Sequence, residues 1–357
     1  MQNSQANHWG RYSTDDPQLR GPWVLSDPAF ATVSNDTVDP YGARCRSPTG
    51  PLHCELPAGP VGSISSPSFL PLPSPKPGEP THILNAAGGK AFAVGSWDAA
   101  NERMVKVSRW MQTVDSSAFN MANWFVAGSA DDGRVLTFGD LQQGKNRDGA
   151  PNVTADNGVL LSPIWTMTSV RVVSWDGQAK QLVANPPAEM VQLRNQSLCA
   201  EAGVSLRPRV PHRLPFPEGE GATMDLELEL ELPPSAFTLG LRVLGEASGT
   251  GNATTLRLHV AASSGGFRAG NATLFTTRGT VTNCTSAFEV LAGESTIALR
   301  MLVDRSVIEA FIAGGRAVLT GRDYPSISET AAHVTVEEGP AVTVRSARAW
   351  SMECAWL

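Results

Sequence analysis

The side chains of this chain that could do chemistry are mainly carboxylates, and no compact nucleophile or metal motif accompanies them. The six histidines are scattered along the sequence, with no spacing that suits a metal site or a Ser-His-Asp set. The sequence has neither a phosphate-binding loop nor the glycine fingerprint of a dinucleotide site, so we expect no cofactor. Asp16, Asp27 and Asp39 each precede a proline, which is also an ordinary turn sequence.

The five cysteines also lack the spacing of a metal site. Cys45 and Cys54 could close a small loop through a disulfide. Cys199 and Cys284 could staple the second half of the chain, which would leave Cys354 without a partner. Five free thiols are the alternative.

Six tripeptides fit the N-glycosylation pattern, beginning at Asn35, Asn152, Asn195, Asn252, Asn271 and Asn283. They predict a secretory history, although the first residues show no signal peptide. The net charge of −6 argues against nucleic acid as the main partner. No apolar run approaches the ~18 residues of a membrane span, so we expect no membrane partner.

The elements that must position these side chains are strands. Residues 225–232 alternate acids with leucines, which predicts a half-buried strand with a solvated acidic face; a cation site on that face is the alternative. In residues 307–311 the strand period places Glu309 on the side of Val307 and Phe311. We therefore expect Glu309 at a packed interface, with Arg316 or Arg322 as its partner.

Further strands in the second half are expected at residues 256–262, 296–303, 307–312, 316–320, 333–337 and 342–350. Short strands with regular turns over this length indicate a β-sandwich. In the first half, the segments 90–95, 123–127 and 134–139 fit strands of propeller blades. A short helix is expected at residues 187–194.

The stretch 299–325 reads as three short strands joined by tight turns, and it closely resembles the C-terminal β-sandwich of glycoside hydrolase family 32. That family contains invertases, fructan hydrolases and fructosyltransferases. Residues 16–24 and 66–73 match family segments more weakly, and these matches occur along the chain in the same order as in the family. The resemblance implies an all-β chain: an incomplete five-bladed β-propeller over residues 1–194, which ends in the connector helix 187–194, and a C-terminal β-sandwich over residues 195–357. It also implies a sandwich disulfide of the kind that Cys199 and Cys284 would form.

The catalytic carboxylates of that family have no clear counterparts in this sequence. Retaining glycosidases need two carboxyl groups about 5 Å apart, one as nucleophile and one as acid and base. The family's nucleophile motif, Trp-Met-Asn-Asp-Pro-Asn-Gly, does not occur here, and Ser65 occupies the acid/base position. The third acid of the family binds the fructosyl hydroxyls and belongs to an Arg-Asp-Pro motif. Its best match here is Asp39, but the arginine before it is absent. Glu55 is a candidate for a displaced acid.

The resemblance implies a glycosidase of the β-fructofuranosidase type, with sucrose or fructan as substrate and an extracellular or vacuolar location by descent. Because a serine hydroxyl cannot donate a proton near neutral pH, we expect this chain to be inactive. Because the nucleophile motif is missing, a fragment of a longer enzyme is also an expected interpretation. The alternatives are a non-catalytic, lectin-like carbohydrate-binding protein and an accessory partner of an active family member. The sandwich could then support a homo- or hetero-oligomer.

Overall fold

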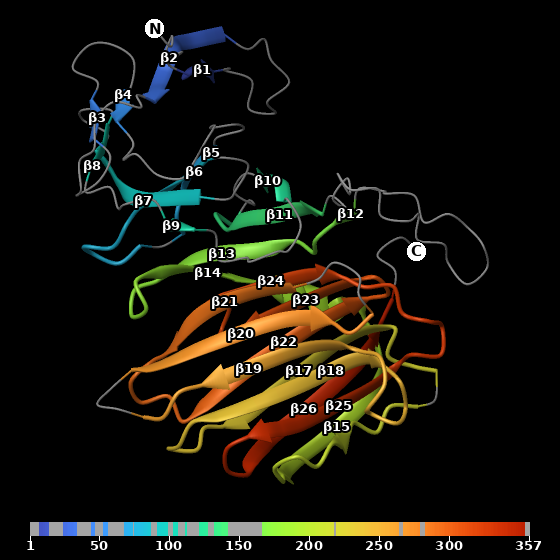
Figure 1. Ribbon diagram of the computed structural model, residues 1–357. Coiled ribbons are helices and arrows are strands. Elements are labelled where there is room, and N and C mark those ends of the chain that lie inside the picture. Colours follow the sequence, from blue (N-terminus) through green and yellow to red (C-terminus); the bar gives the residue numbers. More distant parts are fainter. Residues whose placement is uncertain are drawn as a thin grey trace, which may run out of the picture. The chain divides into compact units, whose positions relative to one another are not determined.

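The computed structural model describes residues 7–13, 24–33, 44–46, 53–55, 68–73, 75–86, 91–98, 103–105, 111–112, 121–127, 132–141, 166–217, 219–263, 267–278 and 283–353. Within these residues every regular element is a strand, except for one short 3-10 helix (Figure 1). The expected all-β class is therefore confirmed.

The chain divides into two compact units, residues 1–113 with 123–135, and residues 114–122 with 136–357. In the first unit, one sheet has the order β1-β2-β4-β3 and another the order β5-β6-β7-β8, with β9 paired to β7. The bounds are β1 Asn7–Ser13, β2 Val24–Val33, β3 Arg44–Arg46, β4 His53–Glu55, β5 Ser68–Pro71, β6 His82–Ala86, β7 Ala91–Asp98, β8 Arg103–Val105 and β9 Met111–Gln112, followed by β10 at Met121–Ala127.

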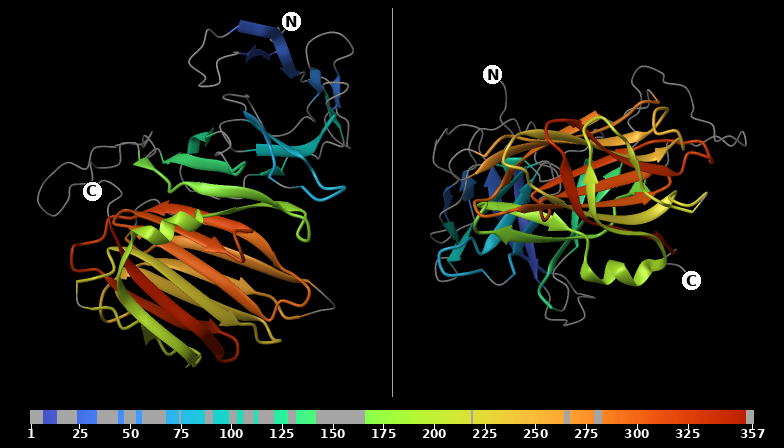
Figure 2. Two further views of the ribbon diagram at one scale, coloured as in Figure 1. Left: turned by 180° about the vertical axis from the view of Figure 1, so that it is seen from behind. Right: turned by 90° about the horizontal axis from the view of Figure 1, so that it is seen from below.

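The second unit begins its regular structure with β11 (Val135–Leu141), β12 (Thr166–Met167), β13 (Arg171–Asp176) and β14 (Gln181–Asn185). β13 and β14 form an antiparallel hairpin, and β12 pairs with β11. The 3-10 helix η2 (Ala188–Leu193) follows and leads directly into β15, as Figure 2 shows. It lies within the segment where the sequence predicts a helix, and it is of the 3-10 type.

Two six-stranded antiparallel sheets form the sandwich (Figure 1). Sheet I has the order β15-β26-β17-β22-β23-β24, with bounds Arg194–Leu206, Val342–Met352, Thr223–Glu231, Thr296–Asp304, Val307–Ile312 and Ala317–Arg322. Sheet II has the order β16-β25-β18-β19-β20-β21, with bounds His212–Arg213, Ala331–Glu338, Phe237–Gly245, Thr254–Val260, Arg268–Thr276 and Asn283–Val290. The expected C-terminal sandwich is confirmed, and its predicted strands are present with ends shifted by a few residues.

The core of the sandwich lies between the two sheets, and β17 shows why the sequence folds this way. Leu226, Leu228 and Leu230 are at most 2% exposed and face the core. Each contributes about 1.5–3 kcal/mol by burial, so the acids between them are turned to the outer face. The alternation of residues 225–232 is thus confirmed as a strand whose leucines point inward.

The division of the chain into domains at residues 194 and 195 stays a prediction. The second unit includes β13 and β14, which precede that boundary in the sequence. These two strands contact β23, β24 and the turn between them.

Candidate functional site

The residues that the family resemblance assigns to catalysis lie outside the part of the chain that the structure describes. Ser65 and Asp39 are the two residues concerned. The glycosylation candidates Asn35 and Asn152 and the cysteine Cys354 also lie outside the described residues. Glu55 ends β4, opposite Arg44 of β3. The roles of Ser65, Asp39 and Glu55 therefore stay predictions.

A groove of about 280 Å³ lies on the outer face of sheet I, and it is the candidate site among the described residues. Its floor comes from β17, β22 and β26, and its side from Asn185 of β14 and from the turn Gly314–Gly315 between β23 and β24. The volume is close to the lower end of the ~300–1,000 Å³ range of small-molecule sites.

The groove exists because two neighbouring rows of the sheet carry side chains of different length. In one row, Glu227 of β17 has Arg348 of β26 and Arg300 of β22 as its register partners. In the next row, Glu229 has Ser346 and Ala298 at the corresponding places. The short serine and alanine leave a hollow beside the long charged side chains, because successive rows on one face are spaced by only two residues.

The charged wall of the groove is organised around Asp225, which is fully buried. Arg300 donates two hydrogen bonds to it, from Nε at 2.9 Å and from Nη2 at 2.7 Å. Arg194 donates to Asp225 at 2.8 Å and also to Glu227, while its guanidinium stacks 3.7 Å from the Trp350 ring centroid. Bidentate pairs of this kind are among the stronger polar contacts in proteins.

Burial lowers the pKa of Arg194, but its hydrogen bonds to Glu227 and Asp225 outweigh that effect and raise the pKa above its ordinary value. Towards solvent, Arg348 donates to Glu227 at 3.0 Å, and Arg345 contacts Glu229 at 3.4 Å. The expectation of a solvated acidic face is thus wrong at Asp225, because arginines of β15, β22 and β26 pair with the acids of β17 and cover this carboxylate.

Glu309 lies at a packed interface as expected, but its predicted partner is wrong. It is 3% exposed and pairs with Arg171 of β13, whose Nη2 lies 2.5 Å from Glu309 Oε2. Its other oxygen accepts a hydrogen bond from the backbone N–H of Ser169 at 2.7 Å. Arg316 instead pairs with Glu294 at 2.6 Å, and Arg322 donates to the Ser306 hydroxyl at 2.9 Å.

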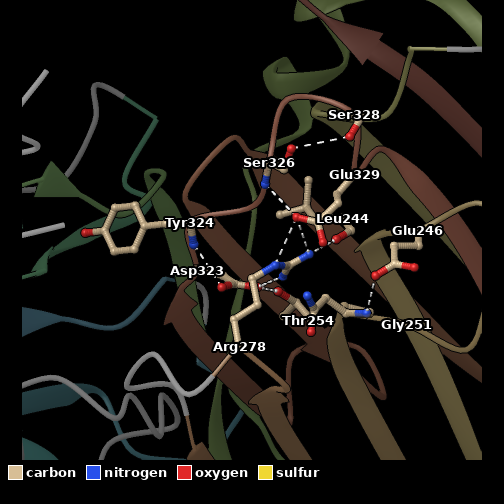
Figure 3. A network of polar contacts seen from close by, with 12 residues as sticks. Leu244, Glu246, Gly251, Thr254, Arg278, Asp323, Tyr324, Ser326, Ser328 and Glu329 are labelled. Carbon is tan, nitrogen blue, oxygen red and sulfur yellow. Dashed lines mark hydrogen bonds and ion pairs between the residues drawn. The ribbon is translucent and has the colours of Figure 1, made fainter. Parts of the chain in front are cut away.

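A second buried network, drawn in Figure 3, ties the turn after β24 to sheet II. The Asp323 carboxylate is fully buried and accepts hydrogen bonds from Thr254 at 2.5 Å, from Thr276 at 2.9 Å and from Arg278. Arg278 also contacts Glu329 at 3.1 Å. Each carboxylate is matched by donors, so this network stabilises the loop from Asp323 to Glu329 and offers no free acid for catalysis.

The expected disulfide between Cys199 and Cys284 is not formed, because both are buried free thiols. Cys199 is on β15, at one edge of sheet I, whereas Cys284 is on β21, which contacts β24 at the other edge. Five strand spacings amount to about 24 Å, far beyond disulfide reach. Cys45 and Cys54 are opposite each other in the β3–β4 pair, and their disulfide stays a prediction.

The predicted glycosylation sites differ in how much the structure says of them. Asn195, Asn252 and Asn271 are exposed, and Asn283 begins β21. N-glycosylation stays a prediction.

Among the described residues, no group of three or more His, Cys, Asp or Glu side chains could hold a metal ion. None of the helices in this part of the chain is long and apolar enough to cross a membrane.

Comparisons with known proteins agree on one family. Residues 189–351 match the family described as Glycosyl hydrolases family 32 C terminal. A stretch of 68 residues is 43% identical to beta-fructofuranosidase, insoluble isoenzyme 2, from Daucus carota, and covers 18% of this chain and 12% of that protein.

Solved structures show the same fold. Fructan 1-exohydrolase IIa from Cichorium intybus aligns with a TM-score of 0.65 at 18% identity, over 82% of this chain and 62% of that one. Exo-inulinase from Aspergillus awamori aligns with a TM-score of 0.60 at 16% identity, over 84% of this chain and 59% of that one. The chain thus spans less than two thirds of the length of each of these relatives. Residues 189–351 of this chain are therefore similar to the C-terminal domain of glycosyl hydrolase family 32.

Proposed function

We propose that this chain is a protein of β-fructofuranosidase descent that does not itself hydrolyse sucrose or fructans. The family match, the stretch shared with a beta-fructofuranosidase and the fold shared with a fructan exohydrolase and an exo-inulinase support the descent. In this proposal the substrates of the ancestral reaction are β-fructosides, cleaved with retention.

The observation that carries the loss of hydrolysis is Ser65, which stands where the family resemblance places the acid/base glutamate. Departure of the leaving sugar requires a proton at the glycosidic oxygen, and a carboxylic acid of raised pKa normally supplies it. A serine hydroxyl does not ionise near neutral pH, so it cannot supply this proton. The argument does not depend on what precedes residue 1, because position 65 is inside the chain.

The test is fructose release from sucrose and from inulin by the purified chain, measured beside an active enzyme of the family. We expect no release above the blank. Circular dichroism with a β-sheet minimum and a cooperative melt would show that the sample is folded, so that inactivity cannot be attributed to misfolding.

Fructose release that Asp39→Ala or Glu55→Ala abolishes would overturn the proposal, since a displaced carboxylate pair would then do the chemistry. A matched control is Asp16→Ala, which changes an acid in the same Asp-Pro context without touching either candidate.

A further inference from the structure

The loop that joins β18 to β19, residues 246–252, covers a histidine on the outer face of sheet II. His333 of β25 is only 4% exposed, although its neighbours Ala332 and Val334 are the residues that face the core. A Cβ on Gly249 would lie 2.9 Å from His333 Cδ2, so the backbone of the loop rests directly on the imidazole. We propose that this loop is a pH-sensitive cover, which is closed while His333 is neutral and opens when His333 takes up a proton. The proposal does not depend on whether the chain hydrolyses fructosides.

The residues beside His333 on the sheet are cationic. Its register partners are Arg213 of β16 and Arg242 of β18. His212 precedes Arg213, and its Nε2 lies 2.8 Å from Glu201 Oε2, so the acid on this side already has a partner. Protonation of His212 would strengthen that pair and add positive charge near His333. A proton on His333 therefore enters a row that already carries two guanidinium groups.

The charged groups around Arg242 do not supply a counter-charge to His333. Arg242 has Glu246 and Glu337 as acidic neighbours and Arg278 as a further cation. Glu337 pairs with Arg257 at 2.6 Å. The Glu246 carboxylate accepts a hydrogen bond from the backbone of its own loop at 3.1 Å. Both acids are thus engaged by other donors while the loop is closed.

The buried ring also has no acceptor for an added proton. His333 Nδ1 has no hydrogen-bond partner among the described residues. Both nitrogens of a protonated histidine are donors, so the charged form would bury an unpaired donor, which is unfavourable away from water. Burial lowers the pKa of His333, and Arg213, Arg242 and His212 act in the same direction, whereas a hydrogen bond with the backbone of Ala247 opposes them.

The loop can open without disturbing the sheet below it. Arg242 Nη2 donates a hydrogen bond to the carbonyl of Gly251, which ties the loop to β18. The other bonds join the two ends of the loop: the N–H of Glu246 donates to the carbonyl of Asn252 at 3.2 Å, and the N–H of Asn252 donates to Glu246 Oε1. The register pairs of β18 with β19 end before the loop begins, so its opening leaves that ladder intact.

The direction of the pH effect follows from proton linkage. With the loop open, His333 is exposed to water and titrates near the ordinary value of about 6.5, whereas burial in the closed form lowers its pKa. Above this range both forms are neutral, and the closed form keeps its full stability. As the pH falls below about 6.5, the open form takes up the proton first and gains population, and the gain is complete below the pKa of the closed form.

Hydrogen exchange read by mass spectrometry, at about pH 7.5 and about pH 5, tests the proposal. The amides of Gly249 and Asn252 report on the loop, because both donate to Glu246 in the closed form. After correction for the intrinsic effect of pH, we expect loop peptides to exchange at least about tenfold faster at the lower pH. Peptides from β19 should keep their protection, which separates opening of the loop from unfolding of the sandwich.

Three variants locate the trigger. His333→Gln removes the titrating ring, so its loop should exchange at the same corrected rate at both pH values. His259→Gln is the matched control and should keep the response, since His259 is an exposed histidine on the outer face of the same sheet. Gly249→Ala places a methyl group against the imidazole, so its loop should exchange fast already at the higher pH. The last variant and the unmodified chain test the proposal even if His333→Gln does not fold.

A loop whose corrected exchange is the same at both pH values would overturn the proposal, as would a response that His333→Gln leaves intact. A response that His212→Gln removes and His333→Gln keeps would assign the effect to His212 instead. Loss of protection in β19 together with the loop would show that acid acts on the whole sandwich, and the proposal of a separate cover would then be wrong.

Discussion

Replacing Glu309 by glutamine removes the negative member of a buried ion pair that links β13 to sheet I. Arg171 is fully buried, and its Nη2 contacts both Glu309 and the Thr320 hydroxyl at 2.8 Å. The Arg171 guanidinium carbon also lies 5.4 Å from the Phe311 ring centroid. The variant would leave the guanidinium, which is shielded from bulk solvent, without the negative charge of Glu309.

Breaking a buried pair by removing one partner costs about 3–5 kcal/mol, because the remaining charge is uncompensated. For a folded unit of this size, each kcal/mol lowers the melting temperature by about 2–4 °C, so we expect a decrease of about 6–20 °C. Urea titration followed by tryptophan fluorescence gives the free energy of unfolding, and differential scanning calorimetry gives the melting temperature.

The double variant Arg171→Met with Glu309→Leu separates charge burial from simple loss of packing. Replacing both members of a buried pair by apolar residues is often neutral or stabilising, so the double variant should recover most of the lost stability. A cost below about 1 kcal/mol for Glu309→Gln, or a double variant no more stable than the single one, would refute the reasoning.

Three further results are expected. Burial and neighbouring cations hold the pKa of His333 below its usual value, so the unfolded chain takes up a proton at a higher pH than the folded one. Stability should therefore decrease as the pH falls below about 6.5, and His333→Gln should flatten this decrease in urea titrations; an unchanged slope would contradict it. Burial raises the pKa of Cys199 to about 11, and Cys284 is also buried, so peptide mapping after iodoacetamide should find both unmodified in the native protein and modified in urea. Gly315→Ala should cost at least about 2 kcal/mol, because its φ is +83° and the new Cβ would lie 2.4 Å from a carbonyl oxygen. Its neighbour Gly314 has a φ of +68° and open space around the position of a Cβ, so Gly314→Ala should cost only about 1 kcal/mol. Equal melting temperatures of the Gly315→Ala and Gly314→Ala variants would contradict this difference.

The sandwich was predictable from the sequence because some of its strands, such as β17, alternate between apolar and polar residues, and others, such as β23, are short apolar runs. The leucines of β17 and the apolar run of β23 identify core positions by strand period alone. β15, β16, β18, β20 and β21 were not predicted, and β15 and β20 show one reason. Glycines and exposed polar residues interrupt both strands, so that pairing with neighbouring strands rather than local pattern defines them.

The groove and the partner of Glu309 could not be predicted, for a different physical reason. Strand period tells which side of a sheet a residue faces, but it does not tell what covers that side. Arg171 is 138 positions before Glu309, and nothing in either local sequence signals their pairing. The groove depends on register between strands, which sets Ser346 and Ala298 beside Glu229. A mixed ladder of acids and arginines on neighbouring strands is the one sequence signal that could have suggested it.

The pair of Arg171 with Glu309 bears on how genes of this kind can recombine. The sequence predicts a domain boundary near residue 195. A recombination crossover at that position would take Arg171 from one parent gene and Glu309 from the other. Gln181 and Asn185, which donate hydrogen bonds to the carbonyls of Arg316 and Gly314, would be separated from their acceptors by the same cut. Chimaeras joined upstream of β13 keep all of these partners in one inherited block, and they are the ones expected to express as folded protein.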